Sequence, residues 1–154
     1  MTGADPWDLA QKVGEALMTR DHAAQRLGIV LEEIRPGQAR MRMAVAHDMV
    51  NSHAICHGGL IFALADTAFA YACNARNRTS LAQSCTITYL ASARAGDVLT
   101  AVCEEAASSG RSGVYDVRVV DQEGRLIALF RGQSRVVKGK ILETGSAGRG
   151  VGEA

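Results

Sequence analysis

One carboxylate interrupts the longest apolar run of the sequence, and two glycines precede it. The run lies within residues 51–76, NSHAICHGGLIFALADTAFAYACNAR, which contain Gly58, Gly59 and Asp66. An ionised carboxylate is costly in apolar surroundings unless it is paired or hydrogen-bonded. Partial burial should raise the pKa of Asp66, and a carboxylate with a raised pKa can activate water. Asp66 is therefore the first candidate for a catalytic group.

The segment that carries Asp66 must be a helix. Residues 60–76 are rich in alanine and leucine, which favour helix, and they contain no residue that would break one. They are apolar nearly all round, which indicates a buried helix. Gly58 and Gly59 at its start would leave backbone N–H groups free at the positive end of the helix dipole, which suits a developing oxyanion. Alternatively, the two glycines merely turn the chain.

Two structural roles of Asp66 compete with catalysis. It could be hydrogen-bonded to Tyr71, Thr67 or backbone, or it could be the partner of an arginine. If it is catalytic, its spacing from the glycines matters: Asp66 follows Gly59 by seven residues, or roughly 10 Å along a helix. Both groups can then act on one carbonyl only if they come from different subunits. Two antiparallel helices about a two-fold axis would achieve this, so we expect a dimer with shared active sites.

The remaining elements predict an α+β fold. Residues 6–20 read as a first helix, with Asp5 as N-cap and Pro6 at its first position. Polar and turn-forming residues separate the strand-like runs, and the connections are short enough for antiparallel neighbours. We predict about six antiparallel strands curled around the long central helix, at residues 27–34, 39–46, 82–93, 98–107, 113–121 and 126–137.

Composition excludes several classes of function. The 154 residues are 47% hydrophobic and 21% charged, with a net charge of +1, which argues against a nucleic-acid-binding protein.

We expect one domain over residues 1–138 and a flexible tail over 139–154. The chain shows no secretory signal, and its apolar run is shorter than the roughly 20 residues that span a bilayer, so we expect a cytoplasmic protein that is not in a membrane. The four cysteines lack metal-ligand spacing, which predicts reduced thiols and no metal site, at residues Cys56, Cys73, Cys85 and Cys103.

Three segments resemble one enzyme family. HGGLIFALADTAFAYACN at residues 57–74 is similar to hotdog-fold acyl-CoA thioesterases of the phenylacetate-degradation (PaaI) type. GRSGVYDV at residues 110–117 and ALFRG at residues 128–132 resemble the same family in the same order. The match covers roughly residues 5–138. It implies a hotdog fold and an acyl-CoA substrate, with no cofactor.

The resemblance also implies roles for the residues of the central segment. Asp66 would be the general base or nucleophile for thioester hydrolysis. The backbone N–H of Gly58, or of Gly59, would stabilise the thioester oxygen. Asn51 would hydrogen-bond the carbonyl or position the attacking water. His57 would orient this loop, or would simply be a turn histidine bonded to backbone.

Two further groups of residues are candidates for substrate binding. The first group lies in a predicted loop and would contact pantetheine or phosphate: Gly110, Arg111, Ser112 and Gly113. Arg131 and Arg135 are weaker candidates for the same contacts. The second would line the acyl pocket near Asp66: Phe62, Thr67 and Ala70.

We therefore expect an enzyme of phenylacetate catabolism that hydrolyses aryl- or arylacetyl-CoA, such as phenylacetyl- or hydroxyphenylacetyl-CoA, to the free acid and coenzyme A. A hotdog hydratase or dehydratase is one alternative, and it would need a histidine and acid pair. A non-catalytic acyl-CoA-binding module is another, and it would have no need of a carboxylate in the middle of the helix. The resemblance further implies that dimers pair into a homotetramer.

Overall fold

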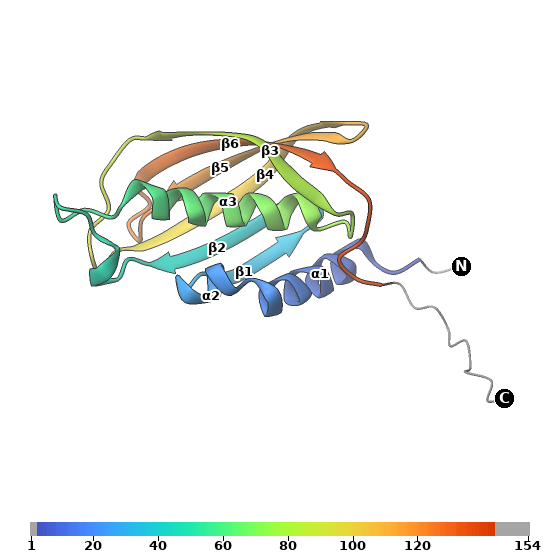
Figure 1. The fold of residues 1–154 in the computed structure, drawn as a ribbon, viewed down its shortest axis with the longest axis horizontal. Helices are drawn as coiled ribbons and strands as arrows, with labels where there is room; N and C mark the ends of the chain where they lie inside the picture. The colour runs from blue at the N-terminus through green and yellow to red at the C-terminus, as the bar shows by residue number, and fades with distance from the viewer. Residues whose placement is uncertain (1–2, 144–154) are drawn as a thin grey trace.

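A six-stranded antiparallel sheet with one long helix lying across its face forms the molecule (Figure 1). The computed structural model describes residues 3–143. The strands lie in the order β1-β2-β4-β5-β6-β3, so β1 and β3 are the two edges of the sheet. This arrangement confirms the predicted α+β fold class. The strands are β1 (Val30–Arg35), β2 (Gln38–Ala44), β3 (Ser80–Tyr89), β4 (Val98–Ser109), β5 (Ser112–Val120) and β6 (Leu126–Val136).

Side chains fix both ends of the central helix, α3 (Gly58–Asn74). It begins at Gly58, where the two glycines were expected to open it, and the His57 side chain caps it by accepting a hydrogen bond from the Gly59 N–H (3.2 Å). At the other end, the Asn74 amide donates to the Ser80 carbonyl (3.1 Å) and accepts from the Ser80 N–H (2.9 Å). Asn74 therefore ties the end of α3 to the start of β3.

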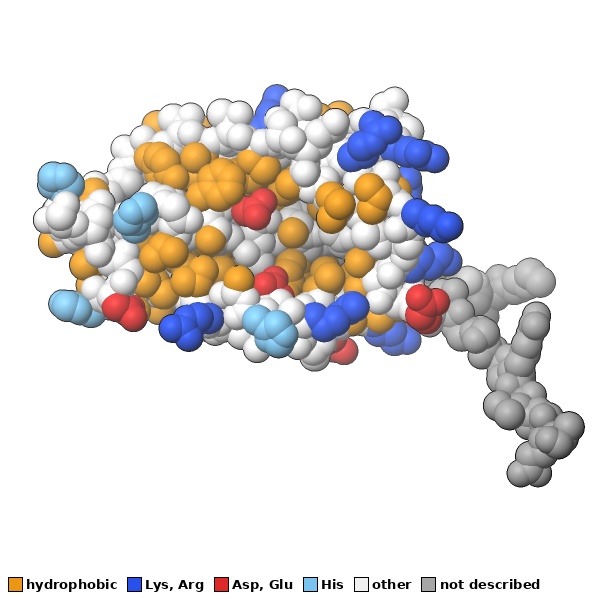
Figure 2. All heavy atoms as spheres, viewed as in Figure 1, with side chains coloured by type: hydrophobic (Ala, Val, Ile, Leu, Met, Phe, Trp, Pro, Cys, Tyr) orange, Lys and Arg blue, Asp and Glu red, His pale blue; other side chains and the backbone are white. Residues whose placement is uncertain are grey.

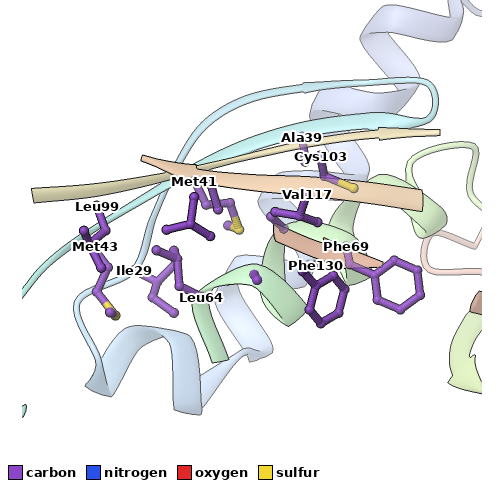
Figure 3. Packing of buried hydrophobic residues seen from close by; sticks show 14 of the residues in the cluster. Ile29, Ala39, Met41, Met43, Leu64, Phe69, Leu99, Cys103, Val117 and Phe130 are labelled. Atoms are coloured by element: carbon purple, nitrogen blue, oxygen red, sulfur yellow. The ribbon is translucent and has the colours of Figure 1, made fainter. Parts of the chain in front are cut away.

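The core lies between α3 and the concave face of the sheet. Leu64 and Phe69 of α3 face side chains of the sheet that include Met41 and Val117 (Figure 3), and all four are at most 1% exposed. The alternation predicted for residues 39–46 is confirmed, since Met41, Met43 and Val45 are all buried. This packing holds α3 in place against the strands.

A glycine in β6 lets one ring of α3 approach the sheet. The Phe69 ring lies directly over Gly132, where an added Cβ would come within 2.8 Å of three ring carbons. The same ring packs against Tyr115 and Phe130, with centroids 5.6 and 5.8 Å away. No residue larger than glycine fits at position 132 without movement of this cluster.

The first helix was predicted well and the second was missed. α1 (Pro6–Arg20) has the predicted bounds, and the Asp5 carboxylate caps it by accepting from the Trp7 N–H (3.1 Å). α2 (His22–Arg26) follows at once, because Asp21 caps it by accepting from the Ala24 N–H (3.0 Å). As a result β1 starts at residue 30 and not at residue 27.

Other strand boundaries also differ from the prediction, most clearly at the end of β3 and at the turn between β4 and β5. β3 ends at Tyr89 and not at residue 93, because the N–H groups of Leu90 and Ala91 both turn to the Ile127 carbonyl. The connection between β4 and β5 shrinks to a two-residue turn, since Ser109 pairs with Ser112 and Gly110 adopts a φ of +57°. The predicted loop residues Ser112 and Gly113 therefore belong to β5.

The segment predicted as a flexible tail starts beside α3 and is hydrogen-bonded at first. The Asn77 carboxamide oxygen accepts from the N–H groups of Ile141 (3.0 Å) and Leu142 (2.8 Å), and the Gly139 carbonyl accepts from the Thr79 N–H (3.2 Å). Residues 144–154 of that segment lie outside the described residues. Over residues 3–143, none of the helices has the length and apolar character needed to cross a membrane.

Candidate active site

One stripe of α3 is left uncovered by its own chain. The opposite side of the helix packs on the sheet. The composition of the helix had suggested that it is buried all round, and this is wrong for the single chain. Figure 2 shows hydrophobic side chains on this open face, with acidic side chains among them. A largely apolar stripe of this kind is a surface that a second molecule would cover. Its half-buried members are Phe62, Ala63, Asp66, Thr67 and Ala70.

Asp66 is the unpaired group of that stripe. Within residues 3–143 its carboxylate takes part in no hydrogen bond and no ion pair. The Tyr71 hydroxyl donates to Asp21 (3.2 Å), and the Thr67 hydroxyl donates to the Ala63 carbonyl (2.6 Å), so neither serves Asp66. Both structural interpretations of Asp66 are therefore wrong for this chain.

The surroundings of Asp66 favour its protonated form. Burial raises the pKa of Asp66, and the negative charge of Asp21 raises it further. Burial also raises the pKa of Cys85 on β3, and the charge of Asp66 adds to that effect. A carboxylate with a raised pKa is a better proton acceptor than an ordinary aspartate. Asp66 can therefore act as a base.

The loop before α3 places a free amide beside a cavity. It is held by hydrogen bonds from the His57 N–H to the Met49 carbonyl (2.9 Å) and from the Cys56 N–H to the Ala93 carbonyl (2.7 Å). The Gly59 N–H is used by the His57 cap. The Gly58 N–H has no acceptor among the described residues. Of the two glycines, only Gly58 therefore has an N–H that remains available to a bound molecule.

His57 is a helix cap in this structure. Its Nδ1 accepts the Gly59 N–H (3.2 Å), so that nitrogen carries no proton. The side chain therefore caps the first turn of α3 and is bonded to backbone, which is the second of the two roles expected of it. A histidine held in this way is a poor candidate for the proton transfer that a hydratase or dehydratase would need.

Asn51 faces the same cavity as Gly58. Its carboxamide oxygen accepts from the His53 N–H (2.9 Å), which fixes the side chain, and its NH₂ group has no acceptor within residues 3–143. The cavity has a volume of about 270 Å³. Sequence reasoning missed its apolar walls, because no motif marks them and they come from three separate segments: Ile55, Ile61, Tyr89, Leu90 and Ala91.

The predicted coenzyme A contacts lie at the opposite end of α3. Ser112 and Gly113 line a small hollow of about 40 Å³ together with Arg76 and Arg78. Lys and Arg side chains gather at this end of the molecule (Figure 2). Arg111 is an exposed residue of the adjoining turn.

Arg131 is not free to bind a phosphate as the sequence had suggested. Its guanidinium donates two hydrogen bonds to Asp116, at 2.7 and 2.8 Å. Arg135 lies beside the turn, paired in register with Ser112.

The chain alone does not bring the candidate groups together. Asn51, His57, Gly58 and Gly59 lie at the start of α3, while Asp66 lies in its middle. Gly58 precedes Asp66 by eight residues, or about 12 Å along the helix axis. The turn at Gly110 lies past the far end of the helix. Within one chain, these groups are therefore too far apart to act on a single carbonyl.

Comparisons with known proteins agree on one family. The model of the thioesterase superfamily matches residues 53–128. The acyl-coenzyme A thioesterase PaaI of Escherichia coli K12 is 43% identical over 132 residues, which cover 86% of this chain and 93% of that protein.

Solved structures show the same fold. The E. coli PaaI protein from the phenylacetic acid degradation operon superposes with a TM-score of 0.87 at 40% identity, covering 88% of this chain and 99% of that one. A mutant of the phenylacetic acid degradation protein PaaI from Thermus thermophilus gives a TM-score of 0.72 at 36% identity, covering 75% and 98%. The wrapped sheet is thus the expected hotdog fold, and the matched segment contains both Gly58 and Asp66. On this sequence identity and this fold, the chain belongs to the thioesterase superfamily.

Proposed function

We propose that this protein is an acyl-CoA thioesterase that hydrolyses arylacetyl-CoA, with phenylacetyl- or hydroxyphenylacetyl-CoA as the substrate in phenylacetate catabolism. The unpaired, half-buried carboxylate of Asp66 is the observation that carries the proposal. A non-catalytic binding module would gain nothing from such a group, which costs stability when it is ionised. The names of the relatives from E. coli and T. thermophilus support the substrate class.

The chemistry needs few groups, because a thioester carbonyl is already activated and thiolate is a fair leaving group. In one route, Asp66 removes a proton from a water molecule while that water attacks the carbonyl carbon. In the other, the Asp66 carboxylate attacks the carbonyl carbon and forms an anhydride, which water then hydrolyses. In both routes the carbon–sulfur bond breaks, and the thiolate of coenzyme A takes up a proton. The Gly58 N–H stabilises the oxyanion, and Asn51 binds the carbonyl or the water.

The two halves of the site come together in a two-fold dimer with antiparallel α3 helices. This pairing sets Asp66 of one chain opposite Gly58 of the other, twice over. Two surfaces support it: the open stripe of α3, and the edge strand β3, where Leu81 and Tyr89 are 58% and 47% exposed. An uncovered edge strand is a natural place for a second chain to pair. Two such dimers then form the homotetramer.

The substrate fits the chain in two parts. The aryl ring enters the 270 Å³ cavity beside Gly58, since a cavity of about 150 Å³ already holds benzene. Phe62, Thr67 and Ala70 form the adjoining wall on the stripe, where Phe62 is held edge-on to Phe130 at 5.4 Å.

The nucleotide of coenzyme A lies at the basic end of the partner chain. There Arg111, with the adjoining residues Gly110, Ser112 and Gly113, meets its phosphates. Four free cysteines among the described residues fit a reducing compartment such as the cytoplasm.

Release of free thiol from a panel of acyl-CoA substrates tests the mechanism. We expect Asp66→Asn to lose on the order of 10²-fold in kcat while it still binds substrate. Asp8→Asn, which removes an exposed carboxylate from the first turn of α1, serves as the control and keeps its activity. Hydrolysis at the wild-type rate in Asp66→Asn would contradict the mechanism.

Mixed dimers test whether the sites are shared. Asp66→Asn and Asn51→Ala are each expected to be nearly inactive. With random pairing about half of the co-expressed dimers are hybrids, and each hybrid has one of its two sites intact, so about a quarter of the wild-type rate should return. No recovery, in dimers shown to be hybrid, would mean that each site is built from a single chain.

A further inference from the structure

Tyr89, the last residue of β3, lies against the first residue of α3. Its hydroxyl donates a hydrogen bond to the Gly58 carbonyl at 2.7 Å. Its ring covers Gly58 so closely that a Cβ added there would lie 3.0 Å from the ring carbon that carries the hydroxyl. The side chain thus contacts Gly58 twice, through the ring and through the hydroxyl.

The first turn of α3 needs such a contact. Glycine loses more conformational freedom on ordering than any other residue, and α3 opens on two glycines. The ends of helices also fray. His57 restrains the N–H of the peptide group that joins Gly58 to Gly59, and Tyr89 holds the carbonyl of that same group.

The geometry points to Tyr89 as a positioning residue that fixes the peptide group joining Gly58 to Gly59, and so holds Gly58 and its own N–H in place at the edge of the cavity. A donor stabilises an oxyanion well only when it is already in place before the charge develops. His57 and Tyr89 hold the turn from opposite sides, one through an N–H group and the other through a carbonyl. This inference rests on the proposed function, in which Gly58 is the oxyanion donor.

Tyr89 keeps the proton that it donates. Burial raises the pKa of Tyr89, and the neighbouring Cys56 raises it further, so the hydroxyl is protonated throughout the neutral range. The ring also lines the acyl cavity, so a test must separate the effect of the hydroxyl from the effect of the wall.

Tyr89→Phe makes that separation, because it removes the hydroxyl and keeps the ring. We expect kcat for phenylacetyl-CoA to fall roughly tenfold, less than the loss from deleting an oxyanion donor. KM, and the affinity for a thioether analogue that cannot be hydrolysed, should stay within about twofold. Tyr115→Phe is the matched control: it removes a hydroxyl from a buried ring packed on Phe69, away from Gly58, and should keep its kcat.

Two results would overturn the inference: an unchanged kcat in Tyr89→Phe, whether or not its KM is raised, or an equal loss of kcat in Tyr115→Phe. Failure of the proposed function gives a different pattern. If Asp66→Asn is inactive while Tyr89→Phe is fully active, only the role of Tyr89 falls. If Asp66→Asn remains active, the proposed mechanism is wrong, and the role of Tyr89 in it is wrong as well.

Discussion

Gly132→Ala places one methyl group where the structure has no room for it. The new Cβ would lie 2.8 Å from three carbons of the Phe69 ring. The ring cannot swing aside freely, because it is fully buried and packs on Tyr115 and Phe130. The backbone at position 132 cannot retreat easily either, since it pairs with β3 on one side and with β5 on the other.

The size of the effect follows from two opposing contributions. Overpacking of a well-packed core costs about 1–3 kcal/mol, and the confined ring and central strand place this case in the upper part of that range. Replacement of glycine lowers the entropy of the unfolded chain and returns roughly 0.5–1 kcal/mol. The expected net loss in free energy of unfolding is about 1.5 kcal/mol, or a fall in Tm of roughly 3–6 °C for a chain of this length.

Urea and thermal denaturation, followed by circular dichroism at one fixed protein concentration, measure this loss. The double variant Gly132→Ala/Phe69→Leu makes the assay specific, because leucine is shorter than phenylalanine. In the Phe69→Leu background, Gly132→Ala should cost nearly nothing, which gives a coupling energy of about 1 kcal/mol or more. A stable Gly132→Ala single variant, or simple additivity in the double variant, would refute the close packing described here.

Two further predictions concern the enzyme. Burial and the charge of Asp21 both raise the pKa of Asp66, and a general base must be unprotonated to act. As the pH is lowered, kcat/KM should therefore begin to fall at a higher pH than it would with an ordinary aspartate. Asp21→Asn should move this acid limb of the pH profile to lower pH, and an unmoved limb would contradict the coupling between Asp21 and Asp66. Arg111→Ala should raise KM severalfold for phenylacetyl-CoA but leave KM unchanged for the phenylacetyl thioester of N-acetylcysteamine, which has no nucleotide; equal changes for both substrates would remove Arg111 from the nucleotide site.

Local signals in the sequence were enough for the elements that depend on local physics. Asp5 and Pro6 mark the start of α1, and the alternation of Met41 and Met43 marks the buried face of β2. α2 escaped notice because five residues are too few to show a helical period. The end of β3 at Tyr89 depends on Ile127, a distant residue to which the next two N–H groups turn. Contacts of that kind leave no trace in a short window of sequence.

Some residues of the candidate site could likewise be predicted from local sequence, and others could not. Asp66 was found because a charge in an apolar run is visible in the sequence itself. Gly58 and Gly59 could not be told apart, because the difference depends on which N–H the His57 ring takes up. Tyr89 was missed altogether, since it meets Gly58 only after the chain has passed along α3 and back through β3.

The helix and the strand that follows it are fastened at both ends. Asn74 joins them through Ser80 at one end, and Tyr89 joins them through Gly58 at the other. Sliding of α3 along β3 would therefore break hydrogen bonds at both ends of the pair. Substrate therefore cannot enter by parting this pair. We expect the entrance to lie at the seam between two chains.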